Sequence, residues 1–298
     1  RKVFIASGVK EERKVGVHVV FESLIKAKNA EKHPFYVLLL GLLYGTIGIL
    51  FELWLFHGKI PNLFIFITVF SAIPLMHKLI VLEEKKDRSA VKERSLLKEH
   101  KKAIISFIAL FLGILGAYAF WYTTLPQQDV NVIFAGQLTE IPALRESVIA
   151  GRATAPGSFL AVFSNNFKVL ILSFVFSFFF GAGAIFILAW NAALIAVALG
   201  SFIRDALASA PGAGMAYVLG TISYGFFGYM THSIFEISSY FIAGLAGGII
   251  SVAVIKHDLF NKNFQRIVKD SFWLIGISFI LLVIGAWVET GMSPLFFR

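Results

Sequence analysis

The chain has 298 residues, of which 57% are hydrophobic and 15% are charged, and 32 of them are phenylalanine. Its apolar stretches are about 20 residues long, which suits helices crossing a hydrocarbon core of about 30 Å and exceeds the about 10-residue strands of an outer-membrane barrel. The absence of cysteine excludes disulfides, thiolate metal sites and cysteine nucleophiles. We therefore expect an all-α, polytopic helical membrane protein in a lipid bilayer.

The net charge of +9 is unevenly distributed along the chain. Eight Lys and Arg residues lie in 1–33, nine in 78–102 and four in 256–269. Basic segments flanking membrane spans are typical of the cytoplasmic side, so they predict topology and contact with anionic lipid, and nucleic-acid binding is not expected. The expected location is the plasma membrane, with several crossings and a cytoplasmic amino terminus.

The amino-terminal part contains three predicted segments. Residues 1–33 predict a cytoplasmic amphipathic helix on the inner membrane surface, with a solvated helix as the alternative. Residues 34–82 predict a transmembrane hairpin that begins at Pro34 and is kinked at Pro74. Residues 83–102 predict a charged cytoplasmic linker. The two crossings that we expect in the hairpin are 35–56 and 63–82.

Residues 103–298 predict a second membrane domain. Its longest moderately polar stretch, 126–165, is expected outside the membrane, with one or two short helices on the outer leaflet. The crossings that we expect are 103–125, 167–189, 192–208, 233–255 and 271–290.

The segment 211–231 is apolar but contains five glycines and a proline. An even number of crossings must join the inner end of the span 167–189 to the basic segment 256–269, and three apolar stretches are available. We therefore interpret 211–231 as a re-entrant or broken helix. The expected total is about seven transmembrane helices. If 211–231 does cross the membrane, then a neighbouring segment does not cross. Otherwise there are eight crossings, and one basic segment violates the rule that such segments lie on the cytoplasmic side.

The strongest candidate for a functional site is the pair His232 and Glu236. An ionised side chain at the bilayer centre costs about 2.5–3.5 kcal/mol on insertion scales, so the carboxylate must be neutral, paired or in contact with water. Residues four apart share a helical face. The pair suits a structural hydrogen bond, a proton or ion site, or two ligands of a metal that would need a third. No metal is assigned.

Two further polar pairs accompany this site. Asn165 and Asn166 lie where the predicted fourth span begins, so they suit a helix cap or contact with the glycine-rich segment. Arg204 and Asp205 lie near the outer end of the fifth span, and they either interact locally or support His232 and Glu236.

From about residue 103 to 290, the chain resembles the stage II sporulation protein M family. The resemblance rests on the sequence NNFKV at Asn165 to Val169, the glycine-rich stretch, and the motif HSIFE at His232 to Glu236. Ser233 occupies a position where the pattern has glycine, which leaves a sharp turn there in question. The resemblance implies a membrane scaffold: the family's namesake works with two peptidoglycan-remodelling partners during engulfment and is not itself taken to be the hydrolase.

The sequence contains no Walker loop, dinucleotide fingerprint or nucleophile elbow, so we expect neither an enzyme nor a cofactor. The hypothesis that follows is a scaffold or assembly factor that organises other membrane or envelope proteins. The alternative is a transporter or channel that binds a small ion or solute at Glu236 and His232. A homo-oligomer remains open.

Overall fold

The computed structural model describes residues 27–56, 60–89, 96–140, 156–180, 183–256 and 262–296. Most of the amino-terminal segment 1–33, the middle of the linker 83–102 and residues 141–155 of the segment 126–165 lie outside the described residues. The expectations for those parts remain predictions.

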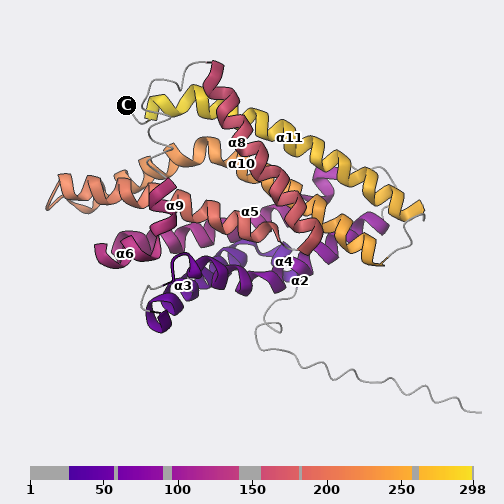
Figure 1. Ribbon diagram of the computed structural model, residues 1–298, viewed down its shortest axis with the longest axis horizontal. Helices are drawn as coiled ribbons and strands as arrows, with labels where there is room; N and C mark the ends of the chain where they lie inside the picture. The colour runs from indigo at the N-terminus through magenta and orange to yellow at the C-terminus, as the bar shows by residue number, and fades with distance from the viewer. Residues whose placement is uncertain are drawn as a thin grey trace, which may run out of the picture.

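Every described secondary-structure element is a helix, which confirms the all-α class. Seven helices are long and apolar enough to cross a membrane, as expected. Figure 1 shows the helices as one elongated bundle. Their bounds are Ala27–Lys32 (α2), Pro34–Phe56 (α3), Leu63–Ser89 (α4), Leu96–Thr124 (α5), Gln127–Ile133 (α6), Pro156–Phe180 (α8), Ala184–Ser209 (α9), Met215–Lys256 (α10) and Lys262–Phe296 (α11).

Helices α3 and α5 pack closely because glycines remove side chains from their contact. A methyl group at Gly113 of α5 would overlap the carbonyl oxygen of Leu38, and one at Gly41 of α3 would overlap the carbonyl oxygen of Leu110. Small residues of this kind allow membrane helices to approach backbone to backbone. The amino-terminal hairpin therefore packs directly on the first helix of the domain predicted for 103–298.

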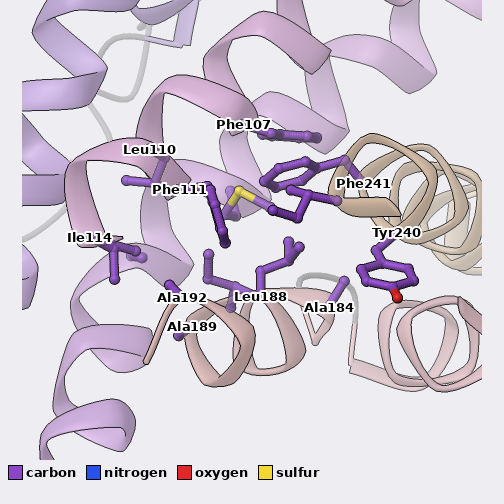
Figure 2. Packing of buried hydrophobic residues seen from close by; sticks show 14 of the residues in the cluster. Phe107, Leu110, Phe111, Ile114, Ala184, Leu188, Ala189, Ala192, Tyr240 and Phe241 are labelled. Atoms are coloured by element: carbon purple, nitrogen blue, oxygen red, sulfur yellow. The ribbon is translucent and has the colours of Figure 1, made fainter. Parts of the chain in front are cut away.

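The centre of the bundle is an aromatic and alanine-rich core between α5, α9 and α10. Figure 2 shows Phe107 and Phe111 of α5 beside Phe241 of α10, with Leu188 and Ala184 of α9 completing the cluster. The Phe107 and Phe241 rings stack with their centroids 5.7 Å apart. Such pairs add to the energy of apolar packing, so this core holds both halves of the chain together.

The boundary between the fourth and fifth crossings differs from the prediction. We expected it at residues 190–191, whereas α8 ends at Phe180 and α9 begins at Ala184. A side chain at Gly183 would overlap the Phe176 carbonyl group. Because glycine has none, the backbone at the start of α9 can lie directly against α8. Trp190 and Asn191 lie inside α9, where the Asn191 amide donates to the Ile187 carbonyl oxygen.

The glycine-rich segment 211–231 is not a broken helix. A turn with Gly212 at φ +81° follows α9, and α10 then runs continuously from Met215 to Lys256. As expected, the segment is not among the seven candidate crossings. Its glycines serve packing and the turn: Gly225 faces Phe202 of α9. Residues 126–140 contain the expected short helices, α6 and a helix at 135–140.

The contact between α3 and α5 predicts a sharp difference between two glycines of α5. Gly113→Ala should destabilise the protein by about 1–3 kcal/mol, because its methyl group meets backbone atoms that cannot rotate away. Gly116→Ala is the matched control, since its methyl group meets only the flexible end of Leu42 at 3.3 Å. Thermal unfolding of purified protein in detergent measures both, and equal melting temperatures would contradict the proposed contact.

Candidate functional site

Glu236 lies inside the bundle on α10. Its side chain is 9% exposed. Eleven residues before it, Gly225 faces Leu199 and Phe202 of α9, and eight residues after it, Gly244 faces Ala184, the first residue of α9. Glu236 is therefore within the height of a membrane-crossing neighbour, where a carboxyl group needs a polar partner.

Asn166 of α8 supplies that partner. Its Nδ2 donates to Oε1 of Glu236 at 2.5 Å, and the Asn166 side chain is also 9% exposed. The expectation that Asn165 and Asn166 cap a helix is wrong, because α8 begins ten residues earlier, at Pro156. Asn165 is exposed on the same helix. Of the two asparagines, Asn166 belongs to the site by contact.

A second carboxyl group completes the site. Glu289 of α11 lies close enough to Glu236 for the two carboxyl groups to interact. The two acids therefore meet between α10 and α11. Gly285, one turn before Glu289, lies against Glu236: a methyl group there would be 2.8 Å from Cγ of Glu236. Its missing side chain leaves room for the acid.

The sequence did not point to Glu289. We expected it at the outer end of the last crossing, where a charge costs little. The four-residue spacing of Gly285 and Glu289 could have indicated it, because the spacing puts a small residue and an acid on one helical face.

The predicted pairing of His232 with Glu236 stays a prediction. Both residues lie on α10 with the expected four-residue spacing, but the His232 side chain is outside the described part of the structure. Ser233 is buried, and its hydroxyl donates to the Tyr229 carbonyl oxygen at 2.7 Å. The serine therefore fits a continuous helix, and the motif forms no sharp turn.

Arg204 joins a different part of the bundle. Its guanidinium donates to the Leu125 carbonyl oxygen and to Oε1 of Gln127, and it lies 5.4 Å from the centre of the Tyr122 ring. These contacts fasten α9 to the junction of α5 and α6. Asp205 beside it is exposed. The described contacts of Arg204 are thus with α5 and α6, and the expected roles of Arg204 and Asp205 stay predictions.

A buried polar cluster at the opposite end of α5 was also missed. His100 lies in the predicted charged linker 83–102, yet it is fully buried, and its Nδ1 lies 2.6 Å from Oε2 of Glu83. Lys86 contacts both Glu83 and Glu31. Burial, followed by the hydrogen bond with Glu83, raises the pKa of Glu31 above its usual value. This cluster fastens α2 to α4 and α5.

Glu52 lies near the end of the predicted crossing 35–56 and is fully buried in the last part of α3. Its Oε2 accepts the backbone N–H of Phe64 at 2.8 Å. That N–H belongs to the first turn of α4 and has no partner within the helix, so Glu52 caps α4 from a neighbouring helix. Among the described residues, no group of three or more His, Asp or Glu side chains is arranged to hold a metal ion.

The contact between Asn166 and Glu236 predicts different roles for two adjacent asparagines. Asn166→Ala should lower the free energy of unfolding by about 1–3 kcal/mol, because a buried carboxyl group loses a hydrogen-bond donor. Asn165→Ala, at an exposed position, should change it by less than about 0.5 kcal/mol. Detergent-based thermal unfolding compares the two, and equal losses would remove Asn166 from the site.

Comparison with known proteins agrees with the resemblance seen in the motifs. Residues 103–294 match the family described as stage II sporulation protein M. An uncharacterized protein of Methanocaldococcus jannaschii is 30% identical over 140 residues, which is 46% of this chain and 71% of the relative. No solved structure matches. The match covers Asn166, Glu236 and Glu289 and more than half of the chain, and the protein therefore belongs to the stage II sporulation protein M family.

Proposed function

We propose that this protein is a non-enzymatic membrane scaffold or assembly factor that organises partner proteins at the membrane or cell envelope. One observation carries the proposal. The buried Glu236 accepts a hydrogen bond from the Asn166 amide, lies beside the Glu289 carboxyl group and packs against Gly285. An acid enclosed in this way fastens three helices to one another.

This polar contact joins three helices. Glu236 belongs to α10, Asn166 to α8 and Glu289 to α11, so the contact sets how the three helices rotate relative to one another. A polar group placed among apolar helices specifies one arrangement, because any other leaves the acid unpaired. A fixed arrangement suits a protein that presents a constant surface to partners.

A second candidate function is a transporter or channel for protons or a small cation. It is favoured by the proximity of the two acids Glu236 and Glu289, because neighbouring acids inside a bundle are a common proton-carrying device. In this alternative the predicted partner His232 would pass the proton on. The enclosure of Glu236 supports the scaffold more than it supports a conducting path.

The proposal includes a location and an orientation. We place the protein in the plasma membrane with its amino terminus in the cytoplasm, on the basis of the three basic segments. Lipids and other membrane or envelope proteins are its partners, and a second copy of the chain is a further candidate. A metal or other cofactor has no part in this function.

Replacement of Glu236 by Gln separates the two functions. The glutamine oxygen can still accept from Asn166, so the helices stay fastened while the acid is lost. For a scaffold, tagged Glu236→Gln protein crosslinked in native membranes should recover the same partner proteins, in the same ratio, as the unchanged protein. The unchanged protein in liposomes should not dissipate a proton or sodium gradient.

Two results would contradict the scaffold. The first is the recovery of no partner in a fixed ratio. The second is a gradient that the unchanged protein dissipates and that Glu236→Gln preserves, which would establish the transport alternative. Asn165→Ala, which changes an exposed neighbour of the site, is the control for both measurements.

A further inference from the structure

The turn between α9 and α10 extends past the rest of the bundle. Figure 1 shows it as the leftmost part of the molecule, beyond α6 and the end of α11. Helix α10 has 42 residues, which corresponds to about 63 Å at 1.5 Å per residue, twice a hydrocarbon core of about 30 Å. Beyond Gly225, Tyr217 and Tyr224 still contact α9, and residues 211–224 at this end of the hairpin are called the overhang.

This overhang is apolar on all sides. Met215 to Thr231 contains no charged residue. Met215 is 72% exposed, and Leu219 and Ile222 are exposed as well. A methyl group added at Gly220 would find nothing within 4 Å. A helix that is apolar all round is stable when it is buried in a protein or surrounded by lipid, and not in water.

The neighbouring contacts of α9 fix the height of this helix. Arg204 binds the Leu125 carbonyl oxygen just after the end of α5, so its guanidinium marks the level of the lipid headgroups. The Tyr217 hydroxyl donates to the Ala206 carbonyl oxygen at 3.2 Å. Tyr217 is therefore close to the lipid headgroups. The headgroup zones on the two sides increase the thickness of the bilayer from about 30 Å for the hydrocarbon core to about 40–45 Å in total.

Lipid is the occupant that the surroundings favour. The exposed residues of the overhang continue without interruption into Phe227 and Ile234, which lie on the part of α10 that packs beside the membrane-crossing helix α9. Tyrosine at the interface, here Tyr217, is typical of an element anchored among headgroups. An uncharged surface with this continuity needs no protein to cover it.

We propose that the overhang, residues 211–224, lies in the headgroup zone and the adjoining upper acyl region of the leaflet at the α6 end of the bundle, with Met215, Leu219 and Ile222 in contact with lipid. This surface is separate from the polar site at Glu236 and independent of the proposed scaffold function. In this position the overhang displaces lipid from one leaflet only.

The absence of native cysteine makes the test direct. Single-cysteine variants Met215→Cys, Leu219→Cys and Ile222→Cys of the full chain are labelled with an environment-sensitive nitrobenzoxadiazole dye. They are reconstituted in phosphatidylethanolamine and phosphatidylglycerol liposomes that contain phospholipid with a doxyl quencher high on the acyl chain. Ser223→Cys, at an exposed small residue, replaces any variant that fails to fold.

Two positions calibrate the measurement. Phe70→Cys, on an exposed apolar position of α4, represents lipid, and Thr139→Cys, on the exposed face of the helix at 135–140, represents water. Doxyl lipid should quench the overhang labels at least half as strongly as the label at residue 70. Iodide should quench them severalfold less than the label at residue 139.

Two other outcomes would overturn the proposal. Iodide quenching equal to that at residue 139 in liposomes would mean that the overhang lies in water and needs a protein partner. Protection from both quenchers that disappears when the protein is diluted into excess lipid would mean that a second copy covers it.

Discussion

The hydrogen bond from Asn166 to Glu236 is the contact on which the carboxyl-terminal half of the bundle depends. A carboxyl group at this depth has no water to bond, and the neighbouring helices offer mostly apolar side chains. The amide of α8 and the Glu289 carboxyl group of α11 supply what water would have supplied. Because all three groups come from different helices, the acid is satisfied only when the helices are assembled.

The same principle operates elsewhere in the molecule. Glu52 of α3 accepts an N–H from the first turn of α4, and Arg204 of α9 donates to the carbonyl oxygen that follows α5. In each contact, a polar side chain of one helix satisfies a group that another helix leaves unpaired. The inner cluster around Glu83 ties the short helix α2 to the bundle in a similar way. These polar contacts specify orientation, whereas the Phe107 and Phe241 core and the α3–α5 glycine contact supply the packing.

The proposed scaffold function rests on how closely Glu236 is enclosed. A conducting protein would need Glu236 to exchange its partners for water or an ion. Here the partners are two fixed side chains and the backbone of Gly285. The overhang of α10 adds a second surface at one end of the bundle, which is chemically opposite to the polar site: it carries no charge and faces away from the other helices. Together they favour a protein that holds a fixed shape in the membrane.

The sequence by itself determined the helical class and the seven apolar helices long enough to cross a membrane, because these depend on local hydrophobicity, and its motifs indicated the family. It misplaced the turn after α8 and interpreted α10 as broken, since a glycine that packs closely and a glycine that breaks a helix look alike along the chain. Only the tertiary structure decided that Asn166 and Glu289 are the partners of Glu236. Those residues are 70 and 53 positions away, and which faces of α8, α10 and α11 meet is a property of packing in three dimensions.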